Sequence, residues 1–261
     1  MPDRTPRSTA HWPLARRWLI ASAMVLALGI TLAFAASVSL TRAAPSWWTN
    51  PRDNDATRAL ATEVENAAVS QLYLARSQAN GAPPEGTSWA SEDWRVALHE
   101  EHINAWLAAR LPRWLEGQPG VPEWPDDMSQ LQVRFEPDAV RAGVRVDTQD
   151  GHRFLTASFK PEIDDRGALW LTASWIHVGR LPVPASWVIG SETRPDGALP
   201  AELIDTPEAA AMLSMIQGKE PMLRVPLLDL EDNRRVRLLD VRVKSGRVEL
   251  TMRTETRATV R

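Results

Sequence analysis

The tetrapeptide His99-Glu100-Glu101-His102 holds the residue types best suited to metal or acid–base chemistry. Two histidines three residues apart can share a metal ion, but the zinc-protease pattern needs a spacing of four with a general-base glutamate between them. A third ligand would have to come from elsewhere in the fold, and no further ligand signature accompanies the pair. We therefore interpret the segment as the start of a helix, where acids in the first turn are favoured by the helix dipole.

No other catalytic or cofactor-binding pattern stands out. The chain has no cysteine, no Gly-x-Ser-x-Gly elbow and no glycine-rich phosphate loop. His152 and His177 fall on predicted strands, where polar residues commonly occupy a solvated face. Three acid pairs lie in predicted loops, and a hydrolase would need them to face each other across a cleft: Asp126-Asp127, Asp164-Asp165 and Glu231-Asp232. We predict a protein that is not an enzyme and uses no cofactor or metal; an envelope hydrolase is the third alternative.

The segment 18–40 contains no charged residue. Because a helix needs roughly 20 apolar residues to cross the hydrocarbon core of a bilayer, the segment predicts a transmembrane anchor. Arg16 and Arg17 directly before it favour a cytoplasmic N-terminus. A cleaved signal peptide is the alternative, although its apolar region is usually about 7–15 residues long. Both interpretations place the rest of the chain outside the cytoplasm.

The predicted span divides the chain into a cytoplasmic tail (1–17), a single-pass anchor in the cytoplasmic, inner membrane (18–40), a juxtamembrane linker (41–54) and an extracytoplasmic domain (55–261). Without cysteine, this domain must hold its fold by burying apolar side chains, and it is long enough to do so. The bilayer is therefore a predicted partner, and a lipid or other amphiphile and envelope proteins are the further candidates.

The chain has 12 tryptophans but one tyrosine. Trp18 stands at the start of the predicted span, and Trp47 and Trp48 follow it closely. Indole rings favour the membrane interface because they are apolar with one polar edge. We therefore predict interface positions for these three residues. Packing of Trp47 and Trp48 on the domain is an equal alternative.

Charge is unevenly distributed along the chain, which has a net charge of −3. Residues 234–261 hold eight arginines and one lysine against three acids, a local net charge of +6. A basic tail can bind acidic lipids or nucleic acid. Here the charges alternate as on a solvated sheet face, and an extracytoplasmic location argues against nucleic acid as a partner.

Helical periodicity dominates the first half of the domain. A helix is predicted over 55–78, because apolar residues recur there at spacings of three and four. A short strand at 94–98 precedes a second predicted helix over 100–116, which Pro112 should kink or end. The apolar face of this helix includes Trp106, Leu107, Leu111 and Trp114.

From residue 131 the period changes to two, which predicts a meander of four antiparallel strands up to Gly179. The chain is then expected to leave the sheet. Helices are predicted at 185–190 and 207–217, followed by strands at 223–230, 235–243 and 247–257, the last two as a hairpin. The predicted fold class is α+β: after the transmembrane helix comes one domain, with a mainly antiparallel curved sheet packed by helices.

Two segments carry a resemblance to a known family. Leu98–Leu107 resembles the entry helix of small bacterial envelope proteins of the YpmS-like type, with two acids followed by a hydrophobic residue and Asn104. Val178–Pro184 resembles their Gly-x-Leu-Pro exit from the sheet. The resemblance implies an N-terminal anchor and a layout similar to tubular lipid-binding (TULIP-like) modules, in which a long helix lies in a curved sheet around an apolar groove. The extra helix at 55–78 departs from that pattern, as does the tryptophan-containing loop at 117–127.

The resemblance supplies no catalytic residues. From its own chemistry, Asn104 is expected to be structural, because an amide at a helix–sheet junction must find polar partners.

The leading functional hypothesis is a domain that binds an apolar or amphipathic ligand between its helices and sheet. The groove candidates are the large apolar residues of the second helix and the fourth strand of the meander: Trp106, Leu107, Leu111, Trp114, Trp170 and Trp175. A closed, ordinary core is the alternative for these residues. A scaffold that docks envelope proteins through a sheet edge or the basic C-terminal hairpin is the second hypothesis.

Overall fold

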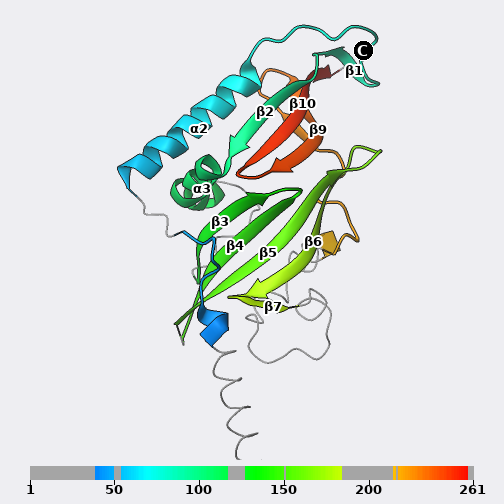
Figure 1. The fold of residues 1–261 in the computed structure, drawn as a ribbon. Coiled ribbons are helices and arrows are strands. Elements are labelled where there is room, and N and C mark those ends of the chain that lie inside the picture. The colour runs from blue at the N-terminus through cyan, green and yellow to red at the C-terminus, as the bar shows by residue number, and fades with distance from the viewer. Residues whose placement is uncertain are drawn as a thin grey trace, which may run out of the picture.

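Alternating apolar and polar residues build two antiparallel sheets, drawn one above the other in Figure 1. The structure is a computed structural model that describes residues 39–49, 54–116, 127–149, 151–183, 214–215 and 217–257. The fold class is α+β with antiparallel sheets, as predicted.

The lower sheet is a meander whose five strands follow chain order. They are β3 (Met128–Glu136), β4 (Ala139–Thr148), β5 (Gly151–Ile163), β6 (Leu169–Val178) and β7 (Leu181–Val183). The first four were predicted from the period of two. The fifth corrects the expectation that the chain leaves the sheet after Gly179. Instead, Gly179 turns with a φ of 63° and Leu181 pairs with Val178.

The upper sheet has the predicted C-terminal hairpin at its centre. Its strands are β1 (Thr87–Ala90), β2 (Trp94–His99), β8 (Leu227–Asp229), β9 (Arg234–Lys244) and β10 (Arg247–Arg257). The order is β1-β10-β9-β8, and β2 also pairs with β10, beyond the end of β1. The strand expected at 223–230 is confined to β8, and β1 was not predicted because four residues show too little periodicity.

Two sheets replace the single curved sheet that we expected, because side chains occupy the outer edge of β3. Asn104 Oδ1 accepts from Val133 N and Asn104 Nδ2 donates to Val133 O, both at 2.8 Å. Glu100 Oε2 accepts from Phe135 N at 2.9 Å. The β9–β10 hairpin completes this edge, since Gly246 N donates to Phe135 O at 3.0 Å. The hydrogen bonds that another strand would make are thereby already satisfied.

The helices are shorter than periodicity suggested. Helix α2 (Asp55–Tyr73) begins after Asn54, whose Oδ1 accepts from Thr57 N at 2.9 Å, and it ends five residues before the predicted end. Residues 77–79 instead pair beside β1, so tertiary pairing overrides the helical pattern. The predicted helix over 100–116 divides into α3 (Glu100–Ala109) and α4 (Leu111–Glu116). The break just before Pro112 is where the proline ring disfavours a continuous helix.

A small apolar cluster joins the two sheets around Phe135, Val243 and Val248. Ile103 of α3 and Leu98 of β2 pack against it. The cluster and the α3 contacts with β3 therefore connect the upper and lower parts of the molecule.

No helix among the described residues is long and apolar enough to span a bilayer. The predicted span, apart from its last two residues, lies outside the described residues, as do Trp18, the predicted helix at 185–190 and most of that at 207–217.

Candidate ligand groove under helix α2

An apolar groove of about 530 Å³ separates helix α2 from the upper sheet. Its floor is formed by β2 and β10, and its roof by the inner face of α2. The lining from the helix is Val64, Ala67, Ala68, Gln71 and Leu72, and that from the floor is Trp94–His99, Leu250 and Met252, with His102 at one end. The volume lies within the range of about 300–1,000 Å³ typical of small-molecule sites.

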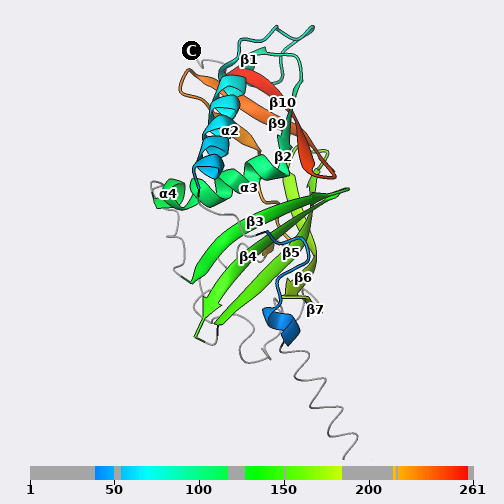
Figure 2. The same cartoon turned by 60° about the vertical axis from the view of Figure 1, so that its left-hand side comes forward.

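Figure 2 shows α2 running from α3 toward the β1 end of the upper sheet. Contacts on either side of the groove hold the helix in place. Over its first three turns it packs on α3, where Ala61 is fully buried and Trp106 Nε1 donates to Glu65 Oε1 at 3.2 Å. Just after its C-terminal end, the Arg76 guanidinium lies 3.6 Å from the centre of the Trp94 ring. Between these contacts the apolar face of α2 lines the groove, and its residues Ala67 and Ala68 are exposed.

The polar side chains of the groove lining include one neutral amide, Gln71, and three basic residues. Arg95, His99 and His102 contribute to its lining, which contains no acid. The two histidine rings meet edge to face with centroids 5.7 Å apart. Within the described residues no group of three or more histidines, cysteines or acids is placed to hold a metal ion. The pair therefore has no third protein ligand there, and its side chains act as part of the groove wall.

The six predicted groove residues are not brought together, and none of them lines this groove. Trp106 of α3 and Trp114 of α4 form an edge-to-face pair with centroids 6.3 Å apart. Trp170 Nε1 instead donates to Asp164 Oδ2 at 2.9 Å in the β5–β6 turn. With Ala168 N, that indole lowers the pKa of Asp164. The remaining three are Leu107 and Leu111, both half-buried, and Trp175, which is 53% exposed on β6.

The signal that does identify the groove is the apolar face predicted over 55–78. That face included Val64, Ala67, Ala68 and Leu72, all of which line the groove. An apolar helical face usually packs on a core. Small alanine side chains at its centre leave the space open instead.

A second pocket of about 310 Å³ lies on the lower sheet, between the juxtamembrane linker and β5–β6. Trp47, Arg141, Trp175, His177 and Arg180 are among its lining residues. Its wall is more polar than that of the α2 groove, and it includes two arginines.

Burial, followed by the nearby Arg141 cation, lowers the pKa of His177 below the usual range for histidine. Folding therefore favours the neutral imidazole, and the unfolded chain takes up a proton first as pH falls. We expect the contribution of His177 to stability to be present above the ordinary histidine pKa and to be lost as pH falls to its lower folded value. NMR titration of the His177 ring should show this depressed midpoint, and Arg141→Gln should raise it. A midpoint at or above the ordinary range would contradict the assignment.

Residues 41–49 of the predicted juxtamembrane linker pack on the lower sheet. Trp48 meets the Phe154 ring edge to face with centroids 4.9 Å apart, and both Trp47 and Trp48 approach Gly143, where a Cβ would collide with them. The fully buried Gln132 side chain exchanges hydrogen bonds with the Thr49 backbone, as a neighbouring strand would. Both indoles thus lie against the domain, and their contact with a membrane interface stays a prediction.

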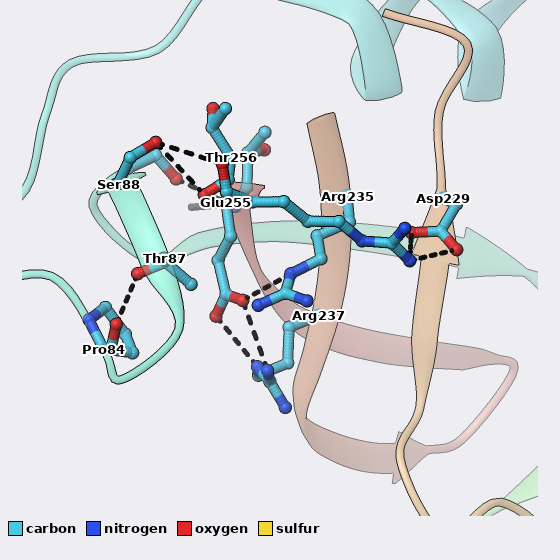
Figure 3. A network of polar contacts seen from close by, with 11 residues as sticks. Pro84, Thr87, Ser88, Asp229, Arg235, Arg237, Glu255 and Thr256 are labelled. Carbon is cyan, nitrogen blue, oxygen red and sulfur yellow. Dashed lines mark hydrogen bonds and ion pairs between the residues drawn. The ribbon is translucent and has the colours of Figure 1, made fainter. Parts of the chain in front are cut away.

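A buried ion cluster stabilises the far end of the upper sheet (Figure 3). Glu255 has no exposed surface, and its carboxylate accepts from Arg235 Nε at 3.1 Å and from Arg237 Nε at 2.8 Å. Beside it, Arg257 binds both carboxylate oxygens of Asp229 at 2.9 Å.

The positive charge of the C-terminal hairpin is largely paired within the fold. Each described basic residue from Arg234 to Arg257 lies within 4.0 Å of an acid, and the acids are Asp93, Asp229, Asp232, Asp240, Glu249 and Glu255. The local excess of arginine therefore neutralises acids that come partly from other segments.

No family model, curated protein or solved structure matches this chain. The geometry of the groove and the chemistry of its lining are therefore the basis for its function.

Proposed function

We propose that this protein is a membrane-anchored, non-catalytic domain that binds an apolar or amphipathic ligand in the groove under α2. The observation that carries the proposal is the unfilled apolar face of α2, which spans a groove instead of packing on the sheet. Apolar surface left exposed in a concave site commonly marks a place where a ligand or partner binds. A bound ligand would remove this surface from water.

The proposed location is the outer side of the inner membrane, with a single-pass anchor at 18–40. The apolar run supports the anchor, and the docked linker supports a fixed placement of the domain beside it. Arg180 N donates to Leu40 O and Arg180 Nε donates to Ala44 O, both at 2.9 Å. The resemblance to YpmS-like envelope proteins is part of the same proposal.

Substitution of one alanine in the groove tests the proposal. Ala68→Trp should fill the groove with an indole, whereas Ala59→Trp adds the same side chain to the same helix at a position outside the lining. Full-length protein would be isolated gently in lipid nanodiscs, and molecules retained with it would be identified by native mass spectrometry and extraction. We expect one retained molecule per chain in wild type and Ala59→Trp, and at least about a tenfold loss in Ala68→Trp.

Equal retention by the two tryptophan variants would contradict the groove as the site. Absence of any retained molecule, with no uptake on titration of oleate or a peptide mixture, would contradict ligand binding itself.

Docking of envelope proteins through the basic hairpin receives little support, because the described basic residues there are paired with acids. Docking through a sheet edge is favoured by the outer edge of β2, which is open within the described residues. This edge also decides the kind of ligand that the groove can accept.

A further inference from the structure

We infer that the ligand of the groove is an extended polypeptide segment that pairs with the outer edge of β2. This inference rests on the proposed function and names the class of ligand. It combines the direction of the β2 backbone, the absence of a strand on that edge among the described residues, and the charge of the groove lining.

The β2 backbone directs its hydrogen-bonding groups alternately to β10 and to the outer edge of the sheet. Glu100 N, just after β2, donates to Gly246 O at 3.0 Å, and the antiparallel register continues from this pair in steps of one residue. Hydrogen-bonded and non-hydrogen-bonded pairs alternate along such a ladder. The N–H and C=O groups of Trp94, Val96 and Leu98 therefore face β10. Those of Arg95 and Ala97 face outward, and both residues line the groove.

The outer edge of β2 is open within the described part of the chain, where β10 is the one strand that pairs with β2. The neighbouring edge is covered. Ala79 N donates to Ala90 O at 2.9 Å, and Glu92 N donates to Ser77 O at 3.1 Å. The chain thus supplies its own extended segment beside β1, and this cover ends before β2 begins. An extended segment of the ligand could continue this cover along β2.

Outward backbone groups distinguish a polypeptide from an acyl chain. A hydrocarbon would remove the N–H and C=O groups of Arg95 and Ala97 from water without bonding to them, which is unfavourable. An extended segment satisfies them and places alternate side chains toward the apolar roof formed by Val64, Ala68 and Leu72.

The charge of the lining further defines the partner. Arg95, His99 and His102 are present and acids are absent. Complementarity therefore favours a segment in which apolar side chains alternate with polar ones that include an acid.

A proline on the edge strand tests strand addition. Ala97→Pro removes the outward N–H, and because that group does not bond to β10, the substitution leaves the ladder bonds in place. Ala97→Ser retains the N–H and is the matched control. Random dodecapeptides displayed on phage would be selected against the full-length protein in nanodiscs. In the selected peptides, apolar side chains should alternate with polar ones that include an acid. Ala97→Pro should weaken the binding of these peptides at least about tenfold, whereas Ala97→Ser should bind them within about twofold of wild type.

A modified peptide gives the same test without altering the protein. N-methylation of a selected peptide at the alternate residues whose backbone N–H groups point to β2 should abolish binding. Methylation of the residues in between, whose N–H groups point away from β2, should preserve it. Hydrogen exchange at the Arg95 and Ala97 amides should slow when the peptide binds.

The outcomes separate this inference from the proposed function. Equal binding of both methylated peptides, or of a folded Ala97→Pro variant and wild type, overturns strand addition. Selection of no peptide, while Ala68→Trp still releases a retained lipid, overturns strand addition and leaves the groove function standing. If Ala68→Trp also changes nothing, both proposals fail.

Discussion

Replacing Glu255 with alanine should lower the free energy of unfolding by about 3–5 kcal/mol, because removing one partner of a buried ion pair leaves the opposite charge uncompensated. Two cations are affected here, since Arg235 and Arg237 both bond to this carboxylate and their side chains are only 14% and 28% exposed. Urea unfolding of the full-length chain in nanodiscs, followed by tryptophan fluorescence, would measure the loss.

Glu249 provides a control on the same strand. It binds Lys244 at 2.8 Å and Arg247 at 2.9 Å, but its side chain is 24% exposed and its partners are 51% and 43% exposed. Glu249→Ala should therefore cost much less than Glu255→Ala, because exposed ion pairs contribute little. Equal losses for the two glutamate variants would show that burial does not decide the strength of the Glu255 cluster.

Replacing the whole cluster separates the pairing of these charges from their burial. A triple variant with Glu255→Leu, Arg235→Leu and Arg237→Met leaves no unpaired charge. Well-packed apolar replacements for buried ion pairs are often neutral or stabilising. We therefore expect the triple variant to be more stable than Glu255→Ala. The alternative result, a loss that exceeds that of the single variant, would mean that the charges themselves organise this end of the sheet.

Strand positions were predicted well where the pattern is local. The strands β9 and β10 begin and end within one residue of the predicted boundaries, and the predicted four-strand meander corresponds to β3–β6. Alternation and turn residues both lie in the sequence itself. The division into two sheets could not be predicted in this way. It depends on which element occupies the edge of β3, and Asn104 is 29 residues from its partner Val133.

The groove predicted from the sequence is built on large aromatic residues, whereas the groove under α2 has a different lining. Trp106 and Trp170 have ordinary structural roles, since each indole N–H bonds to an acid, Glu65 and Asp164 respectively. The lining of the groove under α2 includes Ala67 and Ala68, whose small side chains leave space. Whether an apolar helical face is filled or open depends on how far the opposite sheet lies from it, which periodicity does not encode.

The burial of Glu255 is likewise not predictable from the local sequence pattern. In sequence, Glu255 resembles the other charged residues of an alternating strand, and solvent exposure was the natural expectation. Its register partner on β9 is Arg235, and Arg237 lies two residues further along that strand. These arginines enclose the carboxylate, so a position that looked solvated is among the most buried in the described chain.

Gly179→Ala should release the juxtamembrane linker from the lower sheet. Gly179 has a φ of 63°, and a Cβ there would collide with the carbonyl oxygens of Leu40 and Thr41. The left-handed backbone alone should cost alanine about 1–2 kcal/mol. Relief of the collision would additionally break the hydrogen bond from Arg180 N to Leu40 O. Faster tryptic cleavage after the exposed Arg42, freeing the domain from nanodiscs, would measure the release.

Gly86→Ala separates the backbone cost from the loss of docking. Gly86 has a similar φ of 72°, but no atom lies within 4 Å of its added Cβ. We expect it to lower stability by a comparable backbone cost while leaving cleavage after Arg42 unchanged. If both variants accelerated cleavage equally, general destabilisation would explain the result. If only Gly179→Ala does so, the contact at Gly179 is what holds the linker on the sheet. The α2 groove would then be presented at a fixed orientation to the proposed anchor, which matters for a site that must meet a partner at a membrane.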